Sequence, residues 1–223
     1  MEATRTLTHD EARRFYDRLG RRQDTQAFYE DRATGRLIAL TELDDARSIV
    51  EFGCGTGRFA KKLLERHLAS DARYLAIDAS ATMVAIARTR LVPFGRRATV
   101  VQSDGSPVID IESQSADRFL STFVLDLLSE NDIAAVIEEA QRILVPGGML
   151  GLVSLTHGFT PVTRALMLGW QALHSVRPAL VGGCRPIELQ KFVGGSGWLV
   201  EHHERMSAFG IPSEILVARR LSG

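Results

Sequence analysis

The chain has 223 residues with 27 basic and 27 acidic side chains, and 45% of its residues are hydrophobic, enough for the core of one domain. A net charge of zero argues against a general nucleic-acid binder, because such proteins are usually basic. No apolar run approaches the length of a membrane span or a signal peptide, and two cysteines are too few for a disulfide framework. We therefore expect a cytoplasmic protein.

The first 46 residues are polar, rich in arginine and helix-like, with Thr8 or Asp10 as the cap of a helix that ends at Leu19. Short apolar runs then alternate with amphipathic helical patterns, and a turn is predicted at Pro146–Gly148. The predicted strands cover 48–52, 74–78, 98–102, 119–125 and 149–155, and the predicted helices cover 59–68, 83–91 and 132–144. This alternation predicts a parallel α/β sheet with right-handed crossovers.

The last part of the chain has a different pattern. A helix is predicted at 187–193, followed by strands at 198–203 and 215–219 with no helix between them. Strands that follow one another directly indicate an antiparallel pair at the edge of the sheet.

Three alternating glycines, Gly53, Gly55 and Gly57, lie where the first predicted strand turns into a helix. Glycines let the backbone approach a ligand closely, and the start of the helix offers free N–H groups. A nicotinamide fingerprint fails when it is counted from Gly53, because its sixth residue is Arg58, but it is satisfied from Gly55, where that residue is Ala60. The loop alone therefore does not exclude NAD.

Acidic residues lie at the ends of successive strands. Asp78 ends the second predicted strand, where a carboxylate can accept hydrogen bonds from both ribose hydroxyls. Asp104 follows the third strand, where a carboxylate can accept from the exocyclic amine of adenine. Glu51 precedes the glycines and can order the loop or receive the amino group of an amino-acid ligand. Together these acids indicate a ligand site at one edge of the sheet.

These motifs, with the segment from Arg142 to Gly148, resemble those of the class I S-adenosylmethionine-dependent methyltransferases over about residues 47–155. The resemblance implies a three-layer Rossmann-like sandwich around a seven-stranded, mostly parallel sheet whose last strand is antiparallel. It also implies S-adenosyl-L-methionine as the cofactor, held by Glu51 and the glycine loop at its methionine part, by Asp78 at the ribose and by Asp104 at the adenine. The cofactor-binding residues that it implies are Glu51, Gly53, Cys54, Gly55, Gly57, Asp78, Ala79, Met83, Asp104, Gly105 and Phe123.

The same resemblance suggests two covers for the substrate within one structural domain. The first is an N-terminal helical cap at 1–46, from which Tyr29 could reach the site, with packing on a helix face as the alternative. The second is a lid insertion at about 157–185 in the methyltransferase domain 47–223. Its apolar helix contains Trp170 and could equally be a dimer face or plain packing.

Asp126 and His157 are candidates for a general base, because they follow the fourth and fifth strands at the ligand side of the sheet. Asp126 could instead cap a helix, and His157 could be an ordinary loop histidine. His202 and His203 alternate along a predicted strand, so they cannot face one site, and no metal site is predicted.

We therefore expect methyl transfer to a small, largely apolar or aromatic acceptor. The alternatives are a methyltransferase acting on protein or RNA, a nicotinamide oxidoreductase, and a protein that binds the cofactor without catalysis. We expect a monomer or homodimer, a small-molecule substrate and no nucleic-acid partner. No Asp or Glu occurs from 140 to 187, whereas Arg142, Arg164, Arg177 and Arg185 do, which favours an acceptor that also carries an anionic group.

Overall fold

The computed structural model describes residues 6–195 and 197–222, so the first five residues of the predicted N-terminal cap lie outside the described part. A seven-stranded sheet in the order β3-β2-β1-β4-β5-β7-β6 forms the centre of the molecule. Its strands are β1 (Ser48–Phe52), β2 (Arg73–Asp78), β3 (Ala98–Gln102), β4 (Ala116–Thr122), β5 (Leu144–Leu155), β6 (Trp198–Ala208) and β7 (Ile211–Arg220). The first five strands pair in parallel, whereas β7 is antiparallel to both of its neighbours, which confirms the predicted sheet.

Helices cover both faces of the sheet and give the predicted three layers. The helices are α1 (His9–Leu19), α2 (Ala27–Leu40), α3 (Arg58–Arg66), α4 (Ala81–Leu91), α5 (Glu130–Ile143), α6 (Pro161–Val176) and α7 (Gln190–Val193). Along β1, Ile49 packs with α2, α3 and α4 on one face, and the next residue, Val50, packs with α5 and α7 on the other. This alternation is the period of two that a strand buried on both faces requires.

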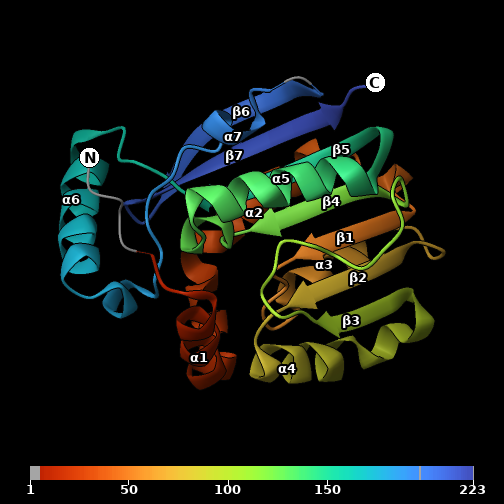
Figure 1. Cartoon of the computed structure of the whole chain (residues 1–223), viewed down its shortest axis with the longest axis horizontal. Coiled ribbons are helices and arrows are strands. Elements are labelled where there is room, and N and C mark those ends of the chain that lie inside the picture. The colour runs from red at the N-terminus through yellow and green to blue at the C-terminus, as the bar shows by residue number, and fades with distance from the viewer. Residues whose placement is uncertain (1–5, 196, 223) are drawn as a thin grey trace.

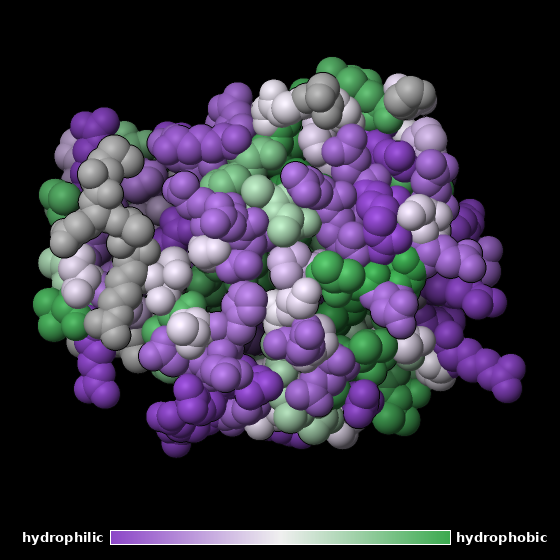
Figure 2. Space-filling view, viewed as in Figure 1, coloured by the Kyte–Doolittle hydropathy of each residue, from purple (hydrophilic) through white to green (hydrophobic). Residues whose placement is uncertain are grey.

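The parallel strands point toward the end of the molecule where α1 and α6 lie (Figure 1). Ligands of open α/β sheets bind beyond the carboxyl ends of the parallel strands, so this is the end at which a site is expected. In Figure 1, α6 stands apart from the sheet layers, and hydrophobic atoms appear along that edge of the molecule in Figure 2. Leu166, Leu168 and Leu173 of α6 are exposed. No helix of the described residues is long and apolar enough to cross a membrane.

Several predicted elements differ from the structure: the last two strands, expected at 198–203 and 215–219, extend over 198–208 and 211–220, and three other elements differ for local reasons. The fourth strand ends at Thr122 rather than at residue 125, because Phe123 adopts a φ of 55° and breaks the extended backbone. The turn predicted at Pro146–Gly148 lies inside β5. Leu144 and Met149 pair with residues of β4, and the residues between them form a bulge in the strand. The helix predicted at 187–193 begins only at residue 190, because the N–H of Ile187 donates to the end of β5.

The two N-terminal helices are held differently. Thr8 caps α1 and forms a capping box with Glu11, as the sequence predicts for one of its two candidate caps. No residue of α1 is fully buried, whereas Ala33 and Leu37 of α2 belong to the main hydrophobic core. Residues 27–40 are therefore part of the layered core, and only the segment before them covers the ligand end.

A buried arginine joins the chain before β1 to the sheet. Arg118 of β4 is almost inaccessible to solvent, and its guanidinium donates to the carbonyl oxygens of Thr41 and Glu42 at 2.7 and 2.6 Å and of Asp117 at 3.0 Å. The carbonyls of Thr41 and Glu42 follow the end of α2, where a helix leaves backbone acceptors without partners. The guanidinium thus satisfies groups that the fold would otherwise leave unpaired in the interior.

We predict that Arg118→Ala lowers the free energy of unfolding by about 2–4 kcal/mol, because buried carbonyl groups lose their donors. Arg36→Ala is the matched control: its guanidinium meets Glu204 at 2.7 Å on the exposed surface, where such a pair contributes at most about 1 kcal/mol. Urea unfolding followed by circular dichroism measures both. Equal effects of the two substitutions would contradict the role assigned to Arg118.

Candidate functional site

The loop after β1 has a backbone that only glycine adopts easily. The φ angles are 78° at Gly53, 52° at Gly55 and 73° at Gly57, all in the left-handed region. The N–H of Gly53 donates to the carbonyl of Ile77 at 2.8 Å and ties the loop to β2. A Cβ atom on Gly53 would lie 2.2 Å from a methyl group of Val124, so a side chain there would collide with the segment after β4.

Asp78 holds this loop from the end of β2. Its Oδ2 accepts a hydrogen bond from the N–H of Gly55 at 2.8 Å, and its Oδ1 accepts one from the N–H of Ser80 at 2.9 Å. Burial raises the pKa of Asp78, and the backbone hydrogen bonds oppose that rise because they stabilise the carboxylate. Each carboxylate oxygen has two lone pairs, so both can accept one further hydrogen bond from a ligand.

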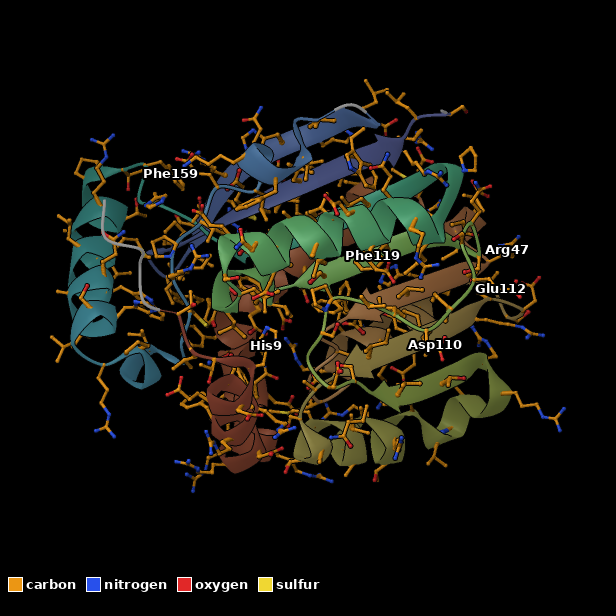
Figure 3. The ribbon with its side chains drawn as sticks, in the orientation of Figure 1. His9, Arg47, Asp110, Glu112, Phe119 and Phe159 are labelled. Atoms are coloured by element: carbon orange, nitrogen blue, oxygen red, sulfur yellow. The ribbon has the colours of Figure 1, made fainter. Side chains whose placement is uncertain are left out.

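A cavity beyond the ends of β1, β2 and β4, which we call the main cavity, brings these groups together with α1. It is lined by residues of α1, of the glycine loop and of the segments that follow β2, β3 and β4: His9, Ala12, Arg13, Tyr16, Gln23, Phe52, Gly53, Gly55, Ile77, Asp78, Ala79, Ser80, Ser103, Gly105, Thr122, Phe123, Val124, Leu127 and Leu128. Figure 3 labels His9 at the end of α1 that faces α5. Its Nε2 lies 3.2 Å from Oδ2 of Asp132 in that helix.

Polar contacts fix the N-terminal segment over this cavity. Asp17 of α1 accepts hydrogen bonds from the hydroxyl of Ser80 at 2.6 Å and from the N–H of Thr82 at 3.1 Å, at the start of α4. Arg90 near the end of α4 pairs with Asp24 at 2.6 Å. The cover is therefore attached to the same helix whose first turn follows Asp78.

Two buried carboxyl groups lie beside the glycine loop. Glu51 of β1 accepts a hydrogen bond from the hydroxyl of Tyr74 at 3.0 Å, and burial raises its pKa to about 8. Glu30 of α2 lies 3.2 Å from Arg58, and burial raises its pKa to about 7 although the guanidinium opposes the rise. Both carboxyl groups, with Cys54, line a small cavity that shares part of the glycine loop with the main cavity. Oε1 of Glu30 has no hydrogen-bond partner among the described residues.

Only some of the residues expected around adenine line the main cavity. Ser103 and Gly105 line the main cavity, whereas the Asp104 side chain between them is exposed and accepts a hydrogen bond from the N–H of Ser106 at 2.8 Å. Met83 is fully buried in α4 and does not belong to the cavity lining. Gly57 also lies outside the lining, as the N-cap of α3.

Phe123 joins the main cavity to α2. Its positive φ is costly for an aromatic residue, and such strain persists only where the surrounding structure holds it. Its N–H donates to the carbonyl of Val153 at 2.8 Å, and its ring meets the ring of Tyr29 edge to face, with 5.6 Å between the centroids. The strained residue thus places an aromatic ring in the cavity wall, with Tyr29 behind it.

Asp126 lies in the turn η4 (Leu125–Leu127) and is buried rather than part of the cavity lining. Its Oδ2 accepts a hydrogen bond from the N–H of Leu155 at 3.1 Å, and Oδ1 has no partner among the described residues. Burial raises the pKa of Asp126 to about 7. Tyr16 and Cys184 lie nearby, with the hydroxyl and the sulfur 4.0 Å apart, and burial raises the pKa of both.

His157 and Trp170 lie away from the main cavity. His157 lines a second cavity between α6, the start of α5 and residues 185–192, and burial lowers its pKa. The indole N–H of Trp170 donates to the carbonyl of Cys184 at 2.8 Å, which packs α6 onto the segment that follows it.

Several cavity residues were missed by the sequence analysis. His9, Arg13 and Gln23 resemble ordinary surface residues in a polar segment, and no spacing marks them. The sequence shows an aromatic pair, Phe15 and Tyr16, but gives no sign of which member faces the cavity. Glu30 likewise carries no local signal, because its burial depends on α2 packing beside the glycine loop.

Comparisons with known proteins agree with this geometry. The family described as "Methyltransferase domain" matches residues 49–148. The chain is 32% identical over 123 residues to trans-aconitate 2-methyltransferase from Azoarcus sp. (strain BH72), covering 54% of this chain and 44% of that protein. It is 26% identical over 152 residues to the tRNA N(3)-methylcytidine methyltransferase trm140 from Schizosaccharomyces pombe. This match covers 65% of this chain and 49% of that protein. The chain thus spans about half the length of the curated relatives it matches.

Among solved structures, the crystal structure of the cyclase SpnF superposes with a TM-score of 0.75 over 99% of both chains, at 18% identity. This likeness extends the shared fold to the N-terminal helices and to α6, and at that identity it concerns the fold alone. A structure described as one of the SAM-dependent methyltransferases, from Methanosarcina mazei, superposes with a TM-score of 0.64 over 84% of this chain and 98% of that chain, at 14% identity. Residues 49–148 therefore match a methyltransferase domain, and the fold is Rossmann-like, as in the solved methyltransferase structures that the chain resembles.

Proposed function

We propose that this protein transfers a methyl group from S-adenosyl-L-methionine to a small acceptor with a largely apolar or aromatic body. The observation that carries the proposal is the composition of the main cavity, which combines the glycine loop and Asp78 with an aromatic and aliphatic wall. That wall contains Tyr16, Phe123, Leu127 and Leu128. An acceptor with an apolar body fits it, because removing apolar surface from water stabilises the complex.

The groups around the glycine loop fit the cofactor. Asp78 keeps lone pairs for the ribose hydroxyls after its bonds to the backbone. Glu30 and Glu51 offer buried carboxyl groups for the ammonium of the methionine part, and Oε1 of Glu30 lacks a partner among the described residues. A cation there would favour the ionised carboxylates, which burial alone disfavours.

At the adenine end we propose Ser103 and Gly105 as lining and Asp104 as the acceptor for the adenine amine. Asp104 lies between the two lining residues, and its exposed side chain is free of ion pairs among the described residues. Met83 contributes from the interior of α4, where it supports the first turn after Ser80.

When bound, the cofactor supplies a methyl group attached to a positively charged sulfur, so the protein must position the acceptor and exclude water. Phe123 can stabilise a cation with its ring, and Tyr29 holds that ring in place. We propose α1 as the cover that excludes water from the main cavity, and residues 157–185, none of which lines that cavity, as an outer cover beside it.

We propose Asp126 as the general base for an acceptor that must lose a proton. Its pKa of about 7, caused by burial, suits proton uptake near neutral pH, and one of its oxygens has no partner among the described residues. Tyr16 lines the main cavity near Asp126, although no hydrogen bond joins the two side chains among the described residues.

We predict that Asp78→Ala weakens binding of S-adenosyl-L-methionine and S-adenosylhomocysteine at least tenfold, because the ribose and the glycine loop lose a shared acceptor. Isothermal titration calorimetry measures the affinity. Asp71→Ala is the matched control, since Asp71 precedes the same strand at its opposite end and is exposed. Unchanged affinity in Asp78→Ala would mean that the ribose assignment is wrong, and binding of NAD without either S-adenosyl compound would refute the proposed activity.

We predict that Asp126→Asn lowers kcat by about 10²–10⁴-fold and leaves cofactor affinity near that of the parent, because asparagine can still accept from Leu155 but cannot take a proton. In the parent, the rate rises with pH up to about 7 and then levels, since the carboxylate form is the active one. In the variant this rise disappears. A variant that keeps the parental kcat and pH profile would exclude Asp126 as the base.

The acceptor class is tested with labelled cofactor against panels of phenols and quinols, apolar carboxylic acids, amino acids and tRNA. We expect turnover with acceptors that have an apolar or aromatic body. Transfer confined to strongly polar acceptors or to tRNA would contradict the proposed substrate class while leaving the cofactor assignment intact.

A further inference from the structure

The second cavity has no part in the cofactor site. It has a volume of about 400 Å³ and shares none of its lining residues with the main cavity. It lies between α6, the first turn of α5 and the chain from 185 to 192, and its lining is mostly polar: Glu130, His157, Gln171, His174, Ser175, Arg185, Pro186, Ile187, Glu188, Lys191 and Phe192. His157, which the sequence analysis singled out, therefore lies in this cavity with another histidine and two basic residues.

Two of these side chains are buried without their full set of partners. Arg185 is 9% exposed and His174 is 4% exposed. One terminal nitrogen of Arg185 donates to the carbonyl of Leu128 at 2.7 Å, but its Nε has no acceptor among the described residues, and neither has Nε2 of His174. Buried polar groups are nearly always hydrogen-bonded, so each missing partner calls for an explanation.

The acidic residues of the cavity do not neutralise this guanidinium by direct contact. Glu188 pairs with Lys191 at 3.1 Å and lies 4.0 Å from Arg205. Glu130, exposed on the first turn of α5, interacts with Arg185 only at longer range. Within the described residues Arg185 thus forms no ion pair, and a buried guanidinium without a counter-ion is costly.

Asp126 is a further acid close to Arg185 in space, and its side chain is directed elsewhere. The backbone N–H of Arg185 donates to the backbone carbonyl of Asp126 at 3.0 Å, whereas the carboxylate of Asp126 accepts from Leu155. The residues from 140 to 187, which contribute much of the cavity, include no acid at all. The fold therefore places a guanidinium, an ammonium and two imidazoles around this cavity, together with the carboxylates of Glu130 and Glu188.

We propose that this second cavity binds an oxyanion, the carboxylate or phosphate group of a small molecule, with Arg185 as its main partner and His174 and Lys191 as further donors. Such a group would accept from the guanidinium of Arg185, which lines the cavity and forms no ion pair among the described residues, and a guanidinium can bind it with two parallel hydrogen bonds. A carboxylate or phosphate group with a short carbon chain fits the cavity by size. The site does not depend on methyl transfer, because none of its residues takes part in the cofactor cavity.

The test is a titration of the isotope-labelled full chain with inorganic phosphate and, separately, with succinate, followed by the side-chain NMR signals of the histidines. We expect saturable shifts at His157 and His174 with at least one of the two anions, and the anion that binds more tightly identifies the chemical class. Arg185→Gln should weaken that binding at least tenfold, and Lys191→Gln about threefold. Absence of saturable shifts with both anions would overturn the proposal.

Controls separate this site from general effects on folding and charge. Arg164→Gln removes a cation from the first turn of α6 outside the cavity and should leave the affinity unchanged. Each variant must also bind S-adenosylhomocysteine as the parent does, which shows that the sheet and the main cavity are intact. Because Lys191 is exposed, Lys191→Gln keeps the test decisive if Arg185→Gln does not fold. Equal anion affinity in Lys191→Gln, Arg164→Gln and the parent would contradict the assigned donors.

Discussion

The carboxylate of Asp78 is the interaction on which the geometry of the main cavity depends, because it connects four parts of the chain. One oxygen accepts from Gly55 in the loop after β1, and the other accepts from Ser80 at the start of α4. The hydroxyl of Ser80 in turn donates to Asp17 of α1. The glycine loop, the end of β2, the first turn of α4 and the helix that covers the cavity thus share one hydrogen-bonded network, and each part fixes the others.

This network also explains how α1 can be held in one position over the main cavity and still detach to let a ligand in. Because α1 buries no residue fully, the hydrogen bonds of its Asp17, and the ion pair of Asp24 with Arg90 in the segment that follows it, contribute much of its attachment. Pairs of this kind, partly exposed to water, each contribute about 1 kcal/mol or less, so the segment opens at a lower free energy than the core helices do. By contrast, α2 is anchored by Leu37 in the core. Ligand entry through α1 therefore costs little stability elsewhere.

Features set by local sequence were predictable, and features set by packing were not. The strands are short buried runs followed by glycine or acid, which placed the glycine loop and Asp78 at the correct edge of the sheet. The same reasoning put Asp126 and His157 at that edge, but the turn η4 buries the first and the loop before α6 carries the second to another cavity. Tyr16 reaches the main cavity only because α1 packs on α4, through contacts that no periodicity reveals.

Although the net charge is zero, the structure contains two local environments that differ in charge: one has buried carboxyl groups and the other has a buried guanidinium. Burial raises the pKa of Glu30, Glu51 and Asp126 to between about 7 and 8. A carboxyl group whose pKa is higher in the folded than in the unfolded state holds its proton more tightly when folded, so raising the pH from about 4 toward 8 lowers stability. A cationic ligand beside Glu30 and Glu51 reverses that cost, since it favours their ionised forms. An anion in the second cavity would likewise offset the cost of burying the Arg185 guanidinium, which forms no ion pair among the described residues.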